Sequence, residues 1–196
     1  MESVQAYIGM GSNLGDGKAI LMEAWESLGN MEGISLAGIS NPFKTAPVDM
    51  KSQHWFTNAV GRLEVELAPL QLLESLLAVE SMFGRARNSR SFGHEDRSLD
   101  LDLLYFGDVV MDSPDLILPH PRINGRLFVL EPLSELAPDF RSAQSRKTVL
   151  ELTEDLKEKM RIKECKNQEI IRDQWDGGVP TTTVPHDETN MEEERL

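Results

Sequence analysis

Apolar and polar positions alternate along four stretches of the chain, and a period of two predicts half-buried β-strands. In the first stretch, Val4, Ala6, Ile8 and Met10 share one face. The predicted strands are residues 4–10, 34–40, 56–67 and 99–106, and the last is expected to return as a hairpin through residues 107–108 into 109–111.

Apolar positions at helical spacing fill the segments between and after these strands. The predicted helices are residues 18–31, 69–83, 125–136 and 148–161. Up to residue 106 the order is strand, helix, strand, strand, helix, strand. This order predicts an α+β, ferredoxin-like fold, in which helices cover one face of an antiparallel sheet and extra helices follow at the C-terminus. Residues 41–55 are expected to form a long loop.

The pattern fades toward the C-terminus. Residues 1–162 hold all the predicted elements and are expected to form the functional domain. Residues 163–196 are interpreted as an extension that is helical at first. From about Trp175 onward few apolar residues remain and the end is acidic, which is typical of disorder.

Composition fits a soluble globular protein, since 40% of the 196 residues are hydrophobic and 27% are charged. The formal net charge of -13 argues against nucleic acid as a partner, because nucleic-acid binders carry basic patches or a high pI. No apolar run approaches the ~18 residues of a membrane span, and residues 1–10 lack the pattern of a signal peptide. The one cysteine, Cys165, cannot form an internal disulfide. We therefore expect a cytoplasmic protein that binds neither nucleic acid nor a membrane; the sequence does not define its oligomeric state.

Two charges interrupt the most apolar strand, which lies in RSLDLDLLYFG, residues 97–107. Aspartate is depleted in strands, and burying a carboxylate is costly unless it is paired or binds a metal. Asp100 and Asp102 are two residues apart, so both point to one face, while the neighbouring leucines point to the other. Their Cα atoms should lie ~6.6 Å apart, a spacing at which converging carboxylates can bracket divalent ions such as Mg²⁺. An ordinary strand with a solvated polar face is the alternative.

The loop before this strand is rich in arginine, with Arg85, Arg87, Arg90 and Arg97 in sequence. Such loops are usually solvated. In a chain of charge -13, however, four arginines beside paired aspartates favour a site for an anion and a metal.

Other motifs carry less information. GMGSNLGD does not match the dinucleotide fingerprint GxGxxG, because after Gly9 and Gly11 the third glycine falls at position 15. A tight strand-to-helix turn is the simpler interpretation. In LPHPR, His120 lies between two prolines and could donate a hydrogen bond to phosphate, although a lone histidine is more often incidental. We find no serine or cysteine nucleophile motif, so in an enzyme the attacking group would belong to the substrate.

Six segments occur in the order found in one family: AYIGMGSNLGD, FKTAPVD, FTNAV, FGHEDRSLDLDLLYFG, LPHPR and RLFVLEPLSELAPD. Over residues 4–160 the chain resembles the 6-hydroxymethyl-7,8-dihydropterin pyrophosphokinases of folate synthesis. The most specific match is the R-x-x-D-x-D core at residues 97–102, followed by Pro119 and His120. The family fold is ferredoxin-like, in line with the predicted strand order.

The resemblance implies transfer of diphosphate from ATP to the hydroxymethyl oxygen of the pterin, with AMP as the other product. Asp100 and Asp102 would hold two Mg²⁺ ions, and catalysis would rest on positioning and electrostatics. Matching family positions imply phosphate contacts for Arg85, Arg87 and Arg97, of which Arg85 and Arg97 count with the aspartates as catalytic. On the nucleotide side the matches are Glu80, Leu103, Ile117, His120 and Arg126.

The resemblance also implies a pterin site. Two aromatic rings can sandwich a flat bicycle, and an asparagine offers its edge both a donor and an acceptor. The matching residues are Gly11, Thr45, Ala46, Val48, Phe56, Asn58 and Phe128. Residues 41–55 and 86–97 match family loops that close over the substrates.

The chain departs from the family pattern at several points. The segment FGHEDR makes the loop before Arg97 longer than the common form, which affects the alignment of Arg90 and Phe92. Leu77 stands where some members carry a polar nucleotide contact, and tyrosine is frequent where this chain has Phe56 and Pro121. Two other functions stay open: a binding or regulatory module that retains nucleotide affinity without catalysis, and a different Mg²⁺-dependent nucleotide enzyme.

Overall fold

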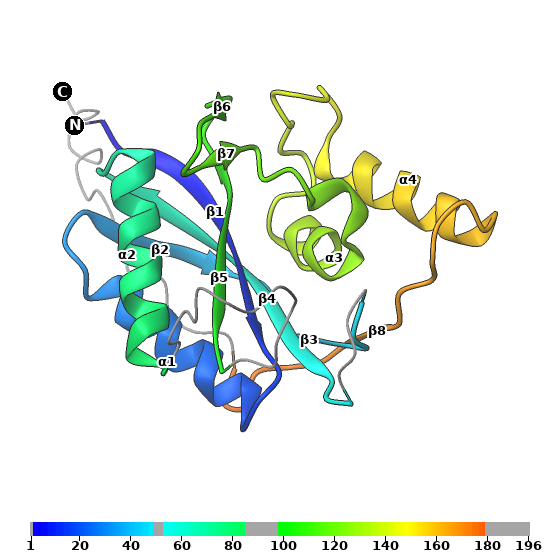
Figure 1. The fold of residues 1–196 in the computed structure, drawn as a ribbon, viewed down its shortest axis with the longest axis horizontal. Coiled ribbons are helices and arrows are strands. Elements are labelled where there is room, and N and C mark those ends of the chain that lie inside the picture. The colour runs from blue at the N-terminus through cyan, green and yellow to red at the C-terminus, as the bar shows by residue number, and fades with distance from the viewer. Residues whose placement is uncertain (1, 49–52, 85–97, 179–196) are drawn as a thin grey trace, which may run out of the picture.

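One antiparallel sheet organises the fold of the computed structural model, which describes residues 2–48, 53–84 and 98–178. The sheet order is β5-β1-β4, then β2 and β3, which pair with different parts of the long strand β4, and then β8 beyond β3 (Figure 1). The strands are β1 (Val4–Ser12), β2 (Ile34–Ile39), β3 (Phe43–Thr45), β4 (Phe56–Val65), β5 (Asp100–Phe106) and β8 (Ile170–Arg172). A separate two-stranded sheet consists of β6 (Met111–Asp112) and β7 (Ile117–Leu118).

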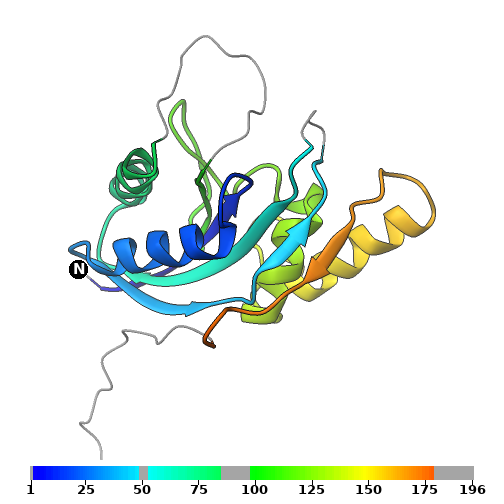
Figure 2. The same cartoon turned by 90° about the horizontal axis from the view of Figure 1, so that it is seen from below.

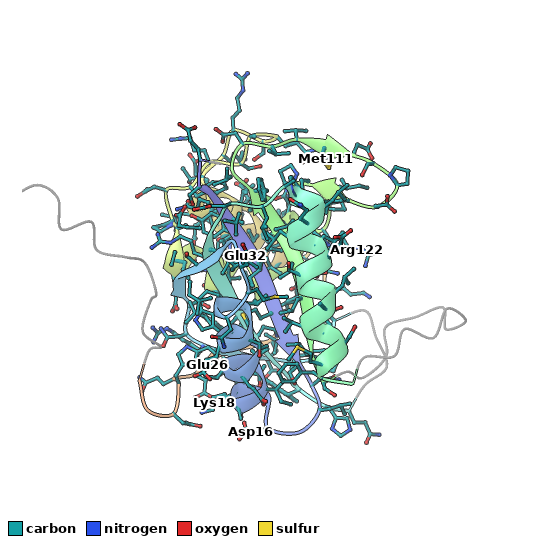
Figure 3. The ribbon with its side chains drawn as sticks, turned by 90° about the vertical axis from the view of Figure 1, so that its left-hand side faces the viewer. Asp16, Lys18, Glu26, Glu32, Met111 and Arg122 are labelled. Atoms are coloured by element: carbon teal, nitrogen blue, oxygen red, sulfur yellow. The ribbon has the colours of Figure 1, made fainter. Side chains whose placement is uncertain are left out.

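Helices cover both faces of the large sheet. One face carries α1 (Gly17–Gly29) and α2 (Pro69–Met82), which Figure 3 shows in front of the strands. The other face carries α3 (Leu127–Leu136), preceded by the 3₁₀ helix η1 (Ile123–Gly125), and α4 (Val149–Arg161). Among the described residues, no helix combines the length and apolar character that crossing a membrane requires.

Local signals explain where the helices begin. At α1 the side chain of Asp16 accepts a hydrogen bond of 3.3 Å from the Ala19 amide, as N-cap residues do. At α4, Thr148 and Glu151 each accept a hydrogen bond from the backbone N–H of the other, at 3.1 and 2.7 Å. Pro69 occupies the first turn of α2, where its missing N–H is not needed.

Two apolar cores lie on opposite faces of the sheet. The first lies under α1 and α2 and includes Trp25 and Leu63; the second lies under α3 and α4 and includes Tyr7 and Leu130. Burial of apolar area on both faces is the main source of stability in such a layered fold.

A β-bulge lets β5 contribute to both cores. Tyr7 of β1 pairs with Tyr105 and Ile8 pairs with Leu103, so Leu104 is an extra residue on β5. Leu103 therefore belongs to the first core, whereas Leu104 and Tyr105 both belong to the second.

The antiparallel sheet and the four α-helices of the described residues confirm the mixed α+β class. The predicted hairpin from β5 into residues 109–111 is wrong, because β6 pairs with β7. Gly107 has a φ of 48°, and the Val109 amide donates to the Phe106 carbonyl at 3.0 Å. This turn directs the chain away from β5.

Two further expectations are wrong. The segment expected as a loop over residues 41–55 contains β3, because β2 pairs with only the second half of β4 and leaves Phe56–Asn58 to another partner. The extension from residue 163 does not start as a helix: it forms β8 beside β3, and Trp175 is buried. The end of the expected disordered tail, residues 179–196, lies outside the described residues.

Candidate active site

Two cavities meet at the start of β5. The first has a volume of about 440 Å³ and lies between the sheet and the start of α3, and the second has a volume of about 310 Å³ and lies beside α2 and the β6–β7 loop. Asp100, Asp102 and Pro121 line both cavities. A pair of carboxylates thus stands where the contents of the two cavities would meet.

The period of two places these carboxylates as predicted. Leu101 and Leu103 are buried in the first core, whereas Asp100 and Asp102 are partly exposed on the opposite face. Further along this face Leu104 is fully buried under α3 and α4, so the polar part of the face is confined to the start of the strand.

Glycines keep the floor of the first cavity open. Gly9 pairs with Asp102 and Gly11 with Asp100, and both glycines line the cavity. The prediction of a tight turn in GMGSNLGD is therefore wrong for these two, which lie within β1. Gly15, with a φ of 69°, occupies the turn before α1.

The donor set fits magnesium. Asp102 forms an ion pair with Arg126, with 3.2 Å between Oδ2 and the guanidinium nitrogen. Among the described residues, no group of three or more His, Cys, Asp or Glu side chains could hold a metal ion by itself. Mg²⁺ suits such a pair, because it commonly binds through one or two carboxylates and takes its other ligands from water and substrate phosphates.

Glu80 anchors the strand that carries the aspartates. Glu80 is 2% exposed, and its Oε1 accepts a hydrogen bond of 2.8 Å from the Leu101 amide. Since Leu101 lies between the two aspartates, Glu80 fixes the backbone that presents them. Glu80 also lines the second cavity.

His120 is held by its backbone and by its ring. Its N–H donates to the Leu104 carbonyl at 2.9 Å, and its Nδ1 accepts from the Arg122 amide at 3.2 Å. Burial lowers the pKa of His120, Arg126 and Arg122 lower it further, and the charge of Asp102 opposes them. A neutral ring that accepts at Nδ1 carries its proton on Nε2 and can donate it.

The polar end of the first cavity is fixed by a buried pair. Asn58 and Thr45 are 7% and 3% exposed, and Asn58 Nδ2 donates to Thr45 Oγ1 at 2.8 Å. Across β1, a Cβ on Gly11 would lie 3.1 Å from Asn58 Oδ1. The amide is therefore oriented before any ligand arrives. Nearer α3, the guanidinium of Arg126 lies 5.5 Å from the centre of the Phe128 ring.

The structure brings most of the predicted site residues together. Those expected on the pterin side all line the first cavity: Gly11, Thr45, Ala46, Val48, Phe56, Asn58 and Phe128. Of the nucleotide-side set, Glu80, Leu103, Ile117 and His120 line the second cavity, whereas Arg126 lines the first. Arg85, Arg87 and Arg97 lie outside the described residues.

Some lining residues were not predicted. In the first cavity they include Gly9, Arg122, Gly125 and Val129, and in the second Ser113 and Asp115. The period of two could have found Gly9, since it shares a strand face with Gly11. Nothing in the sequence pattern around Ser113 and Asp115, in the β6–β7 loop, indicates that they line a cavity.

Residues 7–138 match the family described as 7,8-dihydro-6-hydroxymethylpterin-pyrophosphokinase. The chain belongs to this family. Proteins named 2-amino-4-hydroxy-6-hydroxymethyldihydropteridine pyrophosphokinase from Methylorubrum extorquens and Pseudomonas aeruginosa are 40% and 37% identical to it over 135 and 142 residues. The matches cover 69% and 72% of this chain and 84% and 86% of the two relatives. As a pyrophosphokinase, the chain is an ATP-dependent diphosphotransferase.

Solved structures share the fold. A structure titled as HPPK-DHPS in complex with substrates has a TM-score of 0.68 at 12% identity, over 86% of this chain and 46% of that one. Plasmodium falciparum HPPK-DHPS with pteroate has a TM-score of 0.67 at 11% identity, over 86% of this chain and 48% of that one. The pyrophosphokinase chain thus spans about half the length of these solved chains, and at such identities the likeness shows the fold alone.

Proposed function

We propose that the two cavities divide the substrates of the family's reaction, pyrophosphoryl transfer to 6-hydroxymethyl-7,8-dihydropterin in folate biosynthesis. The pterin occupies the first cavity and ATP the second. The observation that carries this division is that Asp100 and Asp102 line both cavities. At that junction the pterin hydroxyl can meet the β-phosphorus while each substrate keeps its own cavity.

The first cavity suits a flat, polar-edged bicycle. Phe56 and Phe128 supply aromatic surface from β4 and α3, and Asn58 is already oriented by Thr45. With one N–H engaged by Thr45, Asn58 retains a donor and an acceptor for the pterin edge. Orientation before binding lowers the entropy lost when the ligand is held.

The second cavity suits a nucleotide. Leu103 and Ile117 provide apolar surface for a base. His120 lies on the side toward Asp102 and can donate from Nε2 to a phosphate oxygen. Glu80 acts indirectly, through the Leu101 amide and hence the placement of the aspartates.

Asp100 and Asp102 would hold Mg²⁺, two ions in our proposal. When bound, these ions neutralise charge on the transferring phosphates and on the attacking and leaving oxygens. The protein groups orient the two substrates in line and exclude water, and Arg126 balances the charge of Asp102. Arg85, Arg87 and Arg97 complete the phosphate side of the proposal on the strength of the family resemblance.

The topology supports the finer fold assignment. Without β3 and β8, the sheet reads β5-β1-β4-β2, and the chain order is strand, helix, strand, strand, helix, strand. We assign this core as ferredoxin-like and place the catalytic domain in residues 1–162. A cytoplasmic location stays a prediction, as does the acidic tail.

Product analysis tests the function. Purified protein supplied with ATP, Mg²⁺ and 6-hydroxymethyl-7,8-dihydropterin should release AMP and pterin diphosphate in equal amounts. Release of ADP, or turnover that does not depend on the pterin, would contradict the proposal. Binding of ATP without turnover would favour a regulatory module. Calorimetry that detects no pterin binding would favour a different nucleotide enzyme.

A further inference from the structure

The chain beyond α4 wraps round the edge of the sheet. We call residues 168–175 the strap: it starts beside α3 on one face, runs along β3 as β8 and ends in the first core on the other face (Figure 2). The family match ends at residue 138, so the strap lies outside it.

At its start, the strap holds the turn that leads into α3. The Gln168 side chain accepts a hydrogen bond of 2.8 Å from the Leu127 amide and donates one of 2.8 Å to the Gly125 carbonyl. The first amides of a helix lack partners within it, and no side-chain cap within α3 supplies one. Gln168 therefore fixes a segment whose residues Gly125, Arg126 and Phe128 line the first cavity.

The next residues of the strap hold a second part of the same lining. The Ala46 amide donates to the Glu169 carbonyl at 3.2 Å, and Thr45 pairs with Ile170 in the β3–β8 ladder. Thr45 and Ala46 both line the first cavity. Consecutive residues of one segment thus bind two separate parts of the cavity wall.

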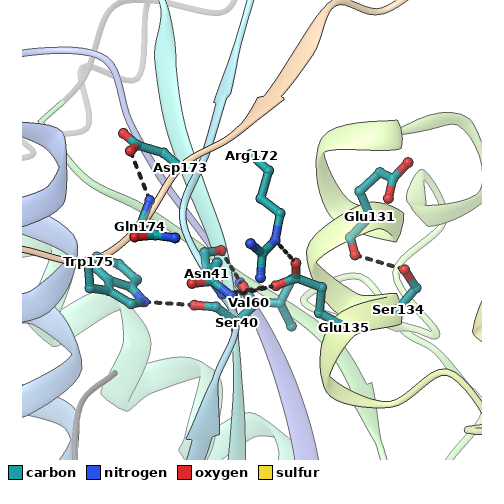
Figure 4. Close-up of polar contacts among 10 residues, drawn as sticks. All are labelled: Ser40, Asn41, Val60, Glu131, Ser134, Glu135, Arg172, Asp173, Gln174 and Trp175. Atoms are coloured by element: carbon teal, nitrogen blue, oxygen red, sulfur yellow. Dashed lines mark hydrogen bonds and ion pairs between the residues drawn. The ribbon is translucent and has the colours of Figure 1, made fainter. Parts of the chain in front are cut away.

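The far end of the strap is anchored (Figure 4). Trp175 is 6% exposed, and its Nε1 donates to the Ser40 carbonyl at 2.9 Å. Arg172 forms an ion pair with Glu135 of α3, and Glu135 also accepts from the backbone amide of Asn41 at 3.1 Å. Because both ends of the strap are fixed, it can hold the two parts of the cavity wall that it contacts at a defined distance from each other.

We propose that the strap sets the width of the pterin cavity, with Gln168 as a positioning residue that holds the Arg126–Phe128 segment relative to Thr45 and Ala46. The inference rests on the proposed placement of the pterin in the first cavity. None of the residues that the strap holds lines the second cavity. Arg126 reaches that cavity only through its ion pair with Asp102, which lines both. The effect on pterin binding should therefore exceed the effect on ATP binding.

The test compares Gln168→Met, which keeps the size of the side chain without its hydrogen bonds, with Asn167→Ala at the exposed neighbouring position. We expect Gln168→Met to raise the KM and the calorimetric Kd for the pterin about 10-fold, because two hydrogen bonds are removed. The Kd of a non-hydrolysable ATP analogue with Mg²⁺ should stay within about twofold, and Asn167→Ala should leave both constants unchanged. Hydrogen exchange at the Leu127 amide should accelerate in Gln168→Met alone.

The outcomes separate the two proposals. Unchanged pterin affinity in Gln168→Met, or an equal loss of ATP-analogue affinity, overturns the role of the strap. Absence of pterin binding by the wild-type protein overturns the proposed function instead. Trp175→Phe, which keeps an aromatic ring but removes the Nε1 donor, provides a second variant and should show the same selectivity with a smaller change.

Discussion

The two faces of the sheet use glycine for opposite reasons. Under α1, a Cβ on Gly61 would lie 2.4 Å from the ring of Trp25, so glycine is required because the space is full. On the other face, the nearest atom to a Cβ on Gly9 would be 3.5 Å away, and Gly9 borders a cavity. On the face under α1, a side chain packs directly against the backbone of a glycine. On the opposite face, a glycine leaves space for the cavity. Stability and ligand binding should therefore respond separately to substitutions on the two faces.

The largest effect should come from the open face. Asp100→Ala and Asp102→Ala should each reduce AMP release at least ~100-fold, more than the 10–100-fold typical of residues that only support a metal ligand. Both carboxylates are partly exposed, so urea unfolding should change little. Asp112→Ala, which removes an exposed carboxylate from β6, is the matched control. Turnover that survives in either variant would remove the metal role from this face.

On the packed face, Gly61→Ala should lower the free energy of unfolding by roughly 1–3 kcal/mol, the usual cost of overpacking a core. Urea denaturation measures the change. Without denaturant, the affinity for the pterin should be unchanged, since Gly61 does not line the first cavity. Gly125→Ala serves as control for stability, because a Cβ there meets nothing within 4 Å. An unchanged unfolding midpoint would show that α1 yields easily and that this face is less tightly packed than described.

Gly11→Ala should weaken pterin binding with little change in stability, the reverse of the effect expected for Gly61→Ala. Its Cβ would lie 3.1 Å from Asn58 Oδ1, so the amide must shift by a few tenths of an ångström. We expect the Kd for the pterin to rise about 10-fold, corresponding to one misaligned hydrogen bond. The free energy of unfolding should change by less than about 0.5 kcal/mol. ATP-analogue affinity is the internal control, and a large loss of stability would contradict the distinction between the two faces.

The smallest effect concerns pH. Burial lowers the pKa of His120 below its ordinary value of 6.5, so the unfolded chain binds this proton more readily than the folded one. The contribution of His120 to the free energy of unfolding is complete above its pKa in the unfolded chain. It is lost as the pH falls through the pKa of His120 in the folded protein. In His120→Asn, measured without Mg²⁺, unfolding free energy should therefore decrease less between about pH 7.5 and 5.5 than in the wild type. Identical pH profiles would show that His120 titrates alike in both states.

Alternation of residue types was enough to predict the long strands. Along β4, Ala59, Leu63 and Val65 fall in the first core, while Val60 falls in the second, as a period of two requires. At the start of β5 the same period predicted a shared face for the aspartates. The bulge at Leu104 left no such signal, because residues 103–106 are all apolar and show no alternation to interrupt.

Short strands were beyond the reach of local pattern. β3 and β8 are three residues long, and their pairing joins Phe43 to Arg172 across most of the chain. Likewise, nothing in the sequence around Gln168 indicates that its amide binds the start of α3. The pterin-side residues came from the family resemblance, and the structure gathers them in one cavity; their individual roles stay predictions.

The extra residue at Leu104 divides β5 into two parts that can vary separately. Before it, the strand presents carboxylates at the junction of two cavities; after it, the same face presents Tyr105 to a closed core. Without the bulge, strict alternation from Asp102 would turn Tyr105 toward the first core and Phe106 toward the second. Deletion of Leu104 would leave Leu103 and Tyr105 as consecutive residues opposite Ile8 and Tyr7, so the acids and Tyr105 would both keep their faces. The bulge thus adds the side chain of Leu104 to the second core without moving either part of the strand.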